Sequence, residues 1–554
     1  MSEGIRVATG LFINEGFESE GAVVLRGARV TGKLSATGGH FRAPSHQEKA
    51  IDAQFIEAAE VELDDDFHAT GRVSLDGSRV ISRLNCDGGQ FNSPDGIALS
   101  VNGLDCAGDM RLGNGLVTVG EVQLLGAKIE RDLSCTGGTF KNSGRIALSA
   151  NGLICRGSVF LNKEFHAVGT VELTGAHITM QLNCTGGTFE CSQGSALRAN
   201  GLRCDSVFLN EKFRAMGTVE LIEARIATQL NCTGGTLECS QGSALRADGL
   251  ICGGSVFLNE QFHALGAVVL VGARITTQLN CTAATLHNDK DVALRAVGLS
   301  TEGDVYLNDG FRATGEVQLI DATVGRQLNC RRGQFETVSA RGLKVGALFD
   351  WRPRAIQKVD VSFAEVGQLR DEQDSWPVNG QTKLAGLMFQ SLGVLTAAKQ
   401  RSDWLRDAQS YAPNVYQQLI RIYRRDGREE DAEHIAIATE RERRRRGNLP
   451  ITRKLWSKFL DVTVRYGYRI QRVLYAVLAL GLVFSVLFSI AQKNDIMEPI
   501  AAGRNVEVKA DTCTRDYPCF IAPAYSFELL FPVVNLRQVS FWLPSASTGW
   551  GCCC

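Results

Sequence analysis

The sequence predicts a mainly β protein built as a parallel β-solenoid, and three observations predict this fold. One pattern recurs at steps of 48 to 50 residues between Gly21 and Gly315. Apolar residues come in short alternations that Gly-Gly or Asn-Gly pairs interrupt, which is typical of strands joined by tight turns. The same region has no sustained apolar run at helical spacing. A chain that returns to one phase in each coil stacks its strands in parallel, so we expect one elongated object.

About seven double-coil repeats of 49 residues are expected to build this solenoid over residues 1–345. Each repeat splits into similar halves, as residues 196–202 and 219–226 do, so one coil has about 24 residues. The five-residue step from Leu173 to Ile178 resembles that of pentapeptide-repeat β-helices. A leucine-rich repeat has coils of similar length, but its Leu-x-x-Leu-x-Leu-x-x-Asn frame is absent, so it is the second-ranked alternative. The recurring glycines are Gly21, Gly71, Gly120, Gly169, Gly217, Gly266 and Gly315.

Composition excludes two broad classes of protein. The 554 residues carry 59 basic and 60 acidic side chains, and this balance gives no whole-chain field for binding nucleic acid. With 44% hydrophobic and 21% charged residues, the chain is not expected to be disordered. Residues 1–12 lack a basic start followed by an apolar run, so no secretion signal is expected there.

Most of the 17 cysteines are expected to be buried structural thiols. Two repeat positions carry them, and Ala36 or Thr301 stands where a thiol is missing, which indicates a small inward residue. No Cys-x-x-Cys pair or neighbouring histidine supports a metal or redox site, and free thiols suit a reducing compartment. The first structural ladder is Cys86, Cys135, Cys184, Cys232, Cys281 and Cys330, and the second is Cys106, Cys155, Cys204 and Cys252.

One outward repeat position varies between histidine and other polar residues. His68, His166, Arg214 and His263 occupy it. The main interpretation is a solvated surface, and the alternative is an unrecognised redox site along this row. No catalytic residue is assigned, no metal is predicted and no cofactor is expected, because no phosphate-binding, haem or iron–sulfur pattern is present.

Residues 346–400 are predicted to cap the solenoid, because an open end exposes sheet edges. Apolar residues at helical spacing predict a helix over Lys383–Leu395. Residues 401–446 are predicted to hold an α-helical hairpin from Pro413, turning at Asp426-Gly427, which resembles a single tetratricopeptide-type unit. One such unit favours a packing adaptor over a peptide-binding array.

A basic juxtamembrane segment at residues 447–472 and an uncharged transmembrane helix at residues 473–491 follow. Nineteen uncharged residues are long enough to cross a hydrocarbon core of about 30 Å. The positive-inside rule then puts the solenoid in the cytoplasm. Basic residues beside a membrane favour anionic lipid over nucleic acid. The candidate membrane-surface residues are Arg443, Arg444, Arg445, Arg446, Arg453, Lys454 and Lys458.

Residues 492–554 are expected to form an extracytoplasmic loop that includes an amphipathic or re-entrant segment. Cys513 and Cys519 are a candidate disulfide pair there, because the outer compartment is oxidising. The segment Tyr525–Trp542 is amphipathic and aromatic, and Glu528, Pro532 and Arg537 interrupt it too much for a span. We therefore expect an amphipathic interfacial or a re-entrant segment instead of a second span.

Several motifs together resemble a family of bacterial proteins called membrane-associated oxidoreductases. They are the repeated Leu-Asn-Cys-x-Gly-Gly, Asp350-Trp351, Ser375-Trp376-Pro377, Tyr416-Gln-Gln-Leu419, the apolar span and residues 529–536. The resemblance covers nearly the whole chain and implies a bacterial cell membrane location. It also implies a redox activity and a second membrane segment after the last motif.

The leading functional hypothesis is a membrane-anchored cytoplasmic solenoid that acts as a protein-binding scaffold or sensor. Its partners would be membrane lipid and a protein on the solenoid face, with no nucleic acid, and an oligomer remains open. The first alternative is the oxidoreductase that the resemblance implies. The second is a channel-like module in which residues 525–536 re-enter the bilayer.

Overall fold

The structure is a computed structural model, and it describes residues 4–14, 16–378, 380–447, 449–463, 465–467, 471–500 and 517–544. The chain divides into two compact units, Met1–Ala432 and Glu433–Cys554. The first unit contains the solenoid, and the second contains the apolar helix.

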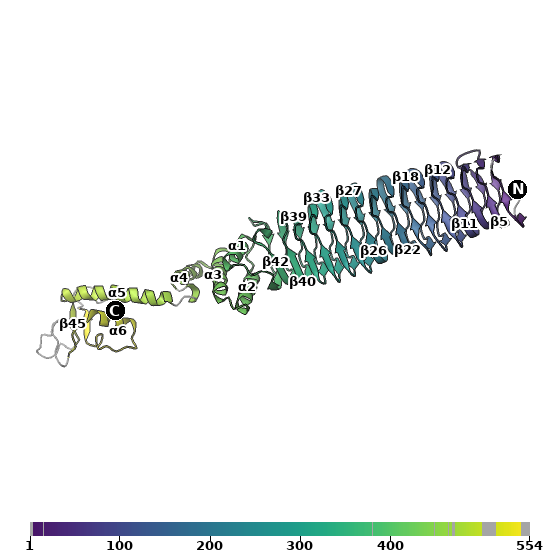
Figure 1. The fold of residues 1–554 in the computed structure, drawn as a ribbon. Coiled ribbons are helices and arrows are strands. Elements are labelled where there is room, and N and C mark those ends of the chain that lie inside the picture. Colours follow the sequence, from purple (N-terminus) through teal and green to yellow (C-terminus); the bar gives the residue numbers. More distant parts are fainter. Residues whose placement is uncertain are drawn as a thin grey trace. The chain divides into compact units, whose positions relative to one another are not determined.

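The first unit is a parallel β-solenoid of about 17 turns, so the predicted fold class is confirmed. Its strands form two parallel sheets, sheet A with 25 strands and sheet B with 19. Figure 1 shows the labelled strands of sheet B along one edge of the solenoid and those of sheet A along the other. At about 4.8 Å per turn, the stack is about 80 Å long.

The strands of sheet A are β1 (Arg6–Val7), β2 (Leu11–Phe12), β5 (Arg29–Ser35), β8 (Glu57–Glu62), β11 (Arg79–Asn85), β13 (Asp105–Cys106), β14 (Asp109–Arg111), β16 (Lys128–Ile129), β17 (Leu133–Ser134), β19 (Ile154–Cys155), β20 (Val159–Phe160), β22 (His177–Asn183), β24 (Arg203–Phe208), β26 (Arg225–Asn231), β28 (Ile251–Cys252), β29 (Ser255–Phe257), β31 (Arg274–Ile275), β32 (Gln278–Asn280), β34 (Ser300–Thr301), β35 (Asp304–Tyr306), β37 (Thr323–Val324), β38 (Gln327–Asn329), β40 (Lys344–Trp351), β42 (Glu365–Asp371) and β44 (Met388–Leu392).

The strands of sheet B are β3 (Glu18–Glu20), β4 (Val23–Val24), β6 (His40–Arg42), β7 (Lys49–Asp52), β9 (His68–Thr70), β10 (Arg72–Ser74), β12 (Gln90–Ser100), β15 (Val117–Gln123), β18 (Thr139–Ser149), β21 (His166–Glu172), β23 (Thr188–Arg198), β25 (Arg214–Glu220), β27 (Thr236–Arg246), β30 (His263–Val269), β33 (Thr285–Arg295), β36 (Arg312–Gln318), β39 (Gln334–Ser339), β41 (Lys358–Asp360) and β43 (Thr382–Lys383).

Long and short turns alternate through most of the solenoid, and this alternation explains the double-coil repeat. Strand β12 has 11 residues, whereas β15 in the next turn has 7. The extra residues 93–96 loop out of the ladder, and only Gly120 of β15 lies opposite them. Gly120 has φ +113°, and a Cβ there would lie 2.3 Å from the Ser93 carbonyl oxygen. The recurring glycine is therefore required wherever a short turn faces a loop from a long one.

Columns of inward side chains fill the core. Cys135, Cys184 and Cys232 alternate along one column with Leu161 and Leu209, and all five are fully buried. A small thiol thus lies between the larger leucines of the turns above and below, which keeps the packing dense. A second column stacks phenylalanine rings 5.0–5.4 Å apart, in the runs Phe17–Phe41–Phe67–Phe91, Phe140–Phe165–Phe189–Phe213 and Phe311–Phe335.

The solenoid turns continue beyond residue 345 as far as β44. The helix expected over Lys383–Leu395 is wrong, because this segment forms β43, a turn and β44. Its apolar residues Leu384, Leu387, Phe389 and Leu392 are all buried in the last turn. Inward positions two, three and five residues apart in a solenoid turn therefore imitated the spacing of one face of a helix.

The helical segments begin between β42 and β43, and all but the first follow the last turn. They are the 3₁₀ segment η1 (Gln373–Ser375), α1 (Ala398–Asp407), α2 (Pro413–Arg425), α3 (Glu429–Arg446), α4 (Ile451–Thr463), the 3₁₀ segment η2 (Arg465–Gly467), α5 (Gln471–Lys493) and α6 (Ala522–Leu530). The two helices expected from Pro413 are present, and Gly427 turns the chain between them with φ +72°. Two short strands, β45 (Met497–Pro499) and β46 (Trp542–Pro544), pair antiparallel in the second unit.

Helix α5 contains the apolar segment expected to cross the membrane. Within the described part of the chain, Leu474–Lys493 is the one stretch of helix that is long and apolar enough to do so. Only 6% of this stretch is buried inside the protein. Its length and composition fit a membrane span, and its low burial differs from that of a core helix.

Candidate functional site: a basic row and a groove on the solenoid

The outer surface of sheet A carries one continuous row of side chains, formed by the first outward position of successive turns. In the N-terminal turns this row alternates in charge, with Arg29 followed by Glu57, Arg79 and Asp105. The guanidinium of Arg29 lies 3.3 Å from Glu57, and that of Arg79 lies 3.9 Å from Asp105. The N-terminal half of the row therefore neutralises its own charge.

In the C-terminal half of the row no acid stands between the cations as far as Lys344, and Glu365 follows it. From β22 to β40 it reads His177, Arg203, Arg225, Ile251, Arg274, Ser300, Thr323 and Lys344. We call Arg203, Arg225, Arg274 and Lys344 the basic row. Among the residues that the structure describes, no carboxylate lies within 4.0 Å of these four side chains. The basic row is thus a band of uncompensated positive charge.

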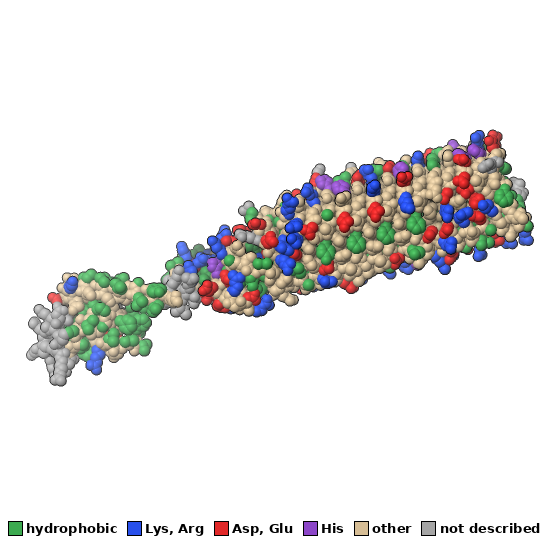
Figure 2. Space-filling view, viewed as in Figure 1, with side chains coloured by type: hydrophobic (Ala, Val, Ile, Leu, Met, Phe, Trp, Pro, Cys, Tyr) green, Lys and Arg blue, Asp and Glu red, His purple; other side chains and the backbone are tan. Residues whose placement is uncertain are grey.

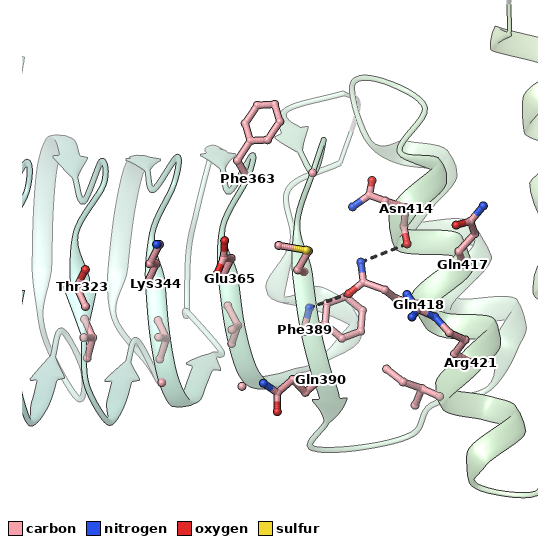
Figure 3. Close-up of a pocket in the computed structure, with 18 of the residues that line it drawn as sticks. Thr323, Lys344, Phe363, Glu365, Phe389, Gln390, Asn414, Gln417, Gln418 and Arg421 are labelled. Carbon is pink, nitrogen blue, oxygen red and sulfur yellow. Dashed lines mark hydrogen bonds between the residues drawn. The ribbon is translucent and has the colours of Figure 1, made fainter.

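The basic row leads into a groove of about 1060 Å³ between sheet A and helix α2, the α2 groove (Figure 3). Thr323, Lys344 and Glu365 follow one another along one side of it. The glycines Gly325, Gly346 and Gly367 form its floor. A Cβ on Gly346 would lie 2.2 Å from the carbonyl oxygen of Gly325, so the close approach of adjacent turns admits no side chain there. A second hollow of about 440 Å³ lies further along the row at Arg203 and Arg225.

Helix α2 forms the opposite wall of the groove and also closes the open edge of sheet A. The Gln418 side chain accepts a hydrogen bond from the Phe389 N–H at 2.8 Å and donates one to the Leu387 carbonyl at 2.8 Å. Asn414 donates to the same carbonyl at 2.8 Å. These amides satisfy the N–H of Phe389 in β44 and the carbonyl of Leu387 just before it, two groups that a further strand would otherwise pair with.

A buried ion pair fixes helix α1 to the solenoid next to α2. Arg401 forms two hydrogen bonds to Asp371, of 2.6 and 2.7 Å, and both side chains are at most 5% exposed. Trp376 donates its indole N–H to the same carboxylate at 2.7 Å. The rings of Trp351, Trp376 and Trp404 follow one another at 5.7 and 5.2 Å. The motifs around Trp351 and Trp376 therefore belong to the cap of the solenoid.

The electrostatics of the α2 groove favour a negatively charged ligand. Lys344, Arg421 and Arg425 line it, and Glu365 is its one acidic lining residue. Arg425 is mostly exposed and lies 3.7 Å from its neighbour Asp426, whereas Arg421 has no carboxylate within 4.0 Å in the described chain. Exposed cations of this kind steer acidic partners and are screened by salt.

The predicted ladder cysteines all lie inside the solenoid. Cys86, Cys135, Cys184, Cys232, Cys281 and Cys330 are at most 1% exposed. Burial raises the pKa of the Cys281 thiol to about 12 and those of Cys155 and Cys204 to about 11. A protonated, inaccessible thiol is a poor nucleophile and metal ligand. Their positions and pKa values therefore fit packing.

The outward residues considered as a redox site do not converge. His166, Arg214 and His263 lie in every second turn of sheet B, about 10 Å apart. His68 lies four turns from His166 and stacks on His40 at 4.8 Å. The described residues contain no group of three or more His, Cys, Asp or Glu side chains placed to hold a metal ion.

The basic residues near the membrane helix divide into two groups. Arg443, Arg444, Arg445 and Arg446 end α3, and each lies within 4.0 Å of Glu440, Glu442 or Asp461. Arg453, Lys454 and Lys458 lie on α4, and no described carboxylate is within that distance of them. Helix α4 also exposes Ile451, Leu455, Phe459 and Val462 along one face. Helix α4 therefore has the character of an interfacial amphipathic helix.

One cysteine of the candidate disulfide lies in the described part of the chain. Cys519 is disulfide-bonded, while Cys513 lies outside the described residues. Their pairing stays a prediction.

Comparisons with protein-family models, with curated proteins and with solved structures give no match for this chain. The resemblance to membrane-associated oxidoreductases therefore stays a prediction from the sequence motifs.

Proposed function

We propose that the protein is a membrane-anchored scaffold whose solenoid binds an acidic segment of a protein partner in the α2 groove. The observation that carries this proposal is the unpaired basic row that runs into the groove. It supports a binding role because the same row is charge-neutralised in the N-terminal turns. Uncompensated surface charge of one sign steers and orients a partner of the other sign.

The shape of the site supports an extended ligand. A volume of about 1060 Å³ is at the upper end of small-molecule pockets, and the site continues along the row to a second hollow. Helix α2 lies against β44 and bonds the Phe389 N–H, so recognition in the groove would not use strand addition. Recognition would come from cationic and amide side chains on a glycine floor.

The anchor is assigned to the second unit. Helix α5 would cross the bilayer, while the apolar face of α4 would lie in the interface with Arg453, Lys454 and Lys458 at anionic headgroups. The basic side of α5 favours a cytoplasmic solenoid. A bacterial cell membrane location and an oxidoreductase activity rest on the family resemblance and stay predictions.

The test is site-specific photocrosslinking in full-length protein within native membranes. A photoreactive amino acid replaces Lys344 in the α2 groove or Lys128, which occupies the same row in an N-terminal turn. We expect an adduct at Lys344 and none at Lys128, with an acidic segment as the crosslinked peptide.

A charge-reversed background provides the control. Arg203→Glu with Arg274→Glu should abolish the adduct at Lys344, because both side chains precede the groove on the same row. Equal adducts at both positions, or an adduct that survives charge reversal, would contradict the proposed site.

A further inference from the structure

We propose that residues 517–544 form a re-entrant hairpin, which enters the bilayer beside α5 and returns to the side from which it came. The inference rests on the proposed membrane span of α5. It selects the re-entrant alternative over an interfacial segment for the apolar motif at residues 525–536. Helix α6 is the descending limb, and residues 531–541 form the tip and the returning limb.

Contacts between α6 and α5 set the depth of the hairpin. Near the end of α5, the rings of Phe488 and Tyr525 meet edge-on at 4.7 Å. Deeper along α5, Leu530 lies 3.4 Å from the position of a Cβ on Gly481. Gly481 precedes Lys493 by 12 residues, or about 18 Å of helix, in a hydrocarbon core of about 30 Å. The end of α6 therefore lies near the middle of the proposed span.

Both limbs of the hairpin meet at one end of α5. Ala491, Met497, Phe520, Tyr525 and Trp542 pack in one buried cluster. Strands β45 and β46 pair there, with Met497 opposite Pro544 and Pro499 opposite Trp542. The Trp542 indole N–H also donates to the Pro518 carbonyl at 3.1 Å. Residues 517–544 therefore begin and end at the same level, as a re-entrant segment must.

Internal hydrogen bonds satisfy several backbone N–H groups of the returning limb, which hydrocarbon could not do. Glu528 is 8% exposed and accepts from the N–H groups of Gln538 and Val539 at 2.7 and 3.1 Å. The Gln538 side chain accepts from the Ile521 N–H at 2.8 Å and donates to the Cys519 carbonyl at 3.0 Å. Gln538 thus ties the return to the entrance of the hairpin, so Arg537 beside it can extend toward headgroups.

The outer surface of the hairpin suits lipid acyl chains. Val533 is 96% exposed, and Phe527, Phe531 and Leu536 are exposed beside it. This surface continues onto the exposed apolar side chains of α5, and Figure 2 shows hydrophobic side chains gathered over α5 and α6. An interfacial helix would turn a polar face to water. In α6 the polar Ser526 and Glu528 are instead buried and hydrogen-bonded.

The test places one fluorescent amino acid at a time in full-length protein reconstituted into phosphatidylcholine vesicles. The positions are Val533 at the tip, Leu478 on α5 as the membrane reference and Asp495 after α5 as the aqueous reference. Doxyl-labelled acyl chains quench probes in the bilayer, and iodide quenches probes in water. We expect Val533 to be quenched by lipid as Leu478 is, and to be protected from iodide.

The references separate failure of the hairpin from failure of the anchor. Iodide quenching at Val533 with lipid quenching at Leu478 would overturn the hairpin and leave the span intact. Iodide quenching at both would overturn the span and, with it, the hairpin.

A second pair of variants tests the internal hydrogen bonds. Glu528→Ala removes the acceptor of two buried N–H groups, so Val533 should lose its protection from iodide. Glu528→Gln keeps one carbonyl oxygen and should retain protection. Unchanged protection in Glu528→Ala would contradict the role of Glu528.

Discussion

The two halves of the sheet A row have the same backbone arrangement, but they differ in whether their outward cations lie next to acidic side chains. In the N-terminal turns, Arg29 and Arg79 face Glu57 and Asp105 across neighbouring turns. In the C-terminal turns, Arg203, Arg225 and Arg274 face no acid among the described residues. A repeat can therefore keep its interior constant while its surface divides into a charge-neutral stretch and a basic stretch.

The interior shows no such division. Cys86 in the N-terminal turns and Cys330 in the C-terminal turns are both buried, and burial raises the pKa of both thiols. The difference between the halves is thus confined to side chains that point outward. Three predictions test this contrast, from the largest expected effect to the smallest.

Alkaline pH should destabilise both halves alike. The thiol pKa is higher in the folded state, at about 12 for Cys281 and about 11 for Cys155, than its ordinary value of 9.0. The contribution of each thiol to stability is therefore complete below pH 9 and is lost as pH rises toward the folded pKa. We expect the free energy of unfolding to fall by about 1 kcal/mol per thiol per pH unit, measured by urea unfolding between pH 8.5 and 10.5.

Matched alanine variants isolate the effect of one thiol. Ala36 occupies the same repeat position, so the variants Cys86→Ala and Cys281→Ala should fold. Each should reduce the pH dependence of the free energy of unfolding by the contribution of the thiol that it removes. A reduction in one half only would mean that the interior also distinguishes the halves.

Loss of the buried ion pair in the C-terminal cap should lower the free energy of unfolding far more than loss of an exposed ion pair in the N-terminal turns. Asp371→Ala leaves Arg401 buried without its partner, which should cost about 3–5 kcal/mol. Asp105→Ala breaks an exposed pair and should cost less than about 1 kcal/mol. Tryptophan fluorescence during urea unfolding measures the first through Trp376 and Trp404, and circular dichroism measures the second. Equal costs would refute the distinction.

Charge reversal should have the smallest effect on stability. In the N-terminal half it should lower stability without affecting crosslinking, and in the C-terminal half it should affect crosslinking without lowering stability. Arg79→Glu places a third acid beside Glu57 and Asp105, so it should destabilise the solenoid by a few tenths of a kcal/mol. Arg225→Glu breaks no ion pair and should leave the unfolding midpoint unchanged. It should nevertheless weaken the Lys344 adduct, whereas Arg79→Glu should not. The opposite result would remove the basic row from the binding site.

The strict repeat made the solenoid and its buried thiols predictable, because Cys135, Cys184 and Cys232 recur in phase with leucines. The helix over Lys383–Leu395 was wrong because its apolar spacing fits both a helix face and one turn. The basic row could not be predicted, because Arg203 and Arg225 become neighbours only through the register of β24 and β26. Gln418 and Arg401 were missed likewise, since their partners Leu387 and Asp371 lie about 30 residues earlier.

The alternation of long and short turns also limits how such a protein can change its length. Deleting a single short turn would bring two long turns together, and the loop at residues 93–96 would lose the glycine at position 120 that makes room for it. Gain or loss of whole two-turn units avoids this clash. The length of the solenoid should therefore vary between descendants of one ancestor in increments of about 10 Å. In such a protein the distance between the cap and the opposite end of the solenoid could change only in increments of one two-turn unit.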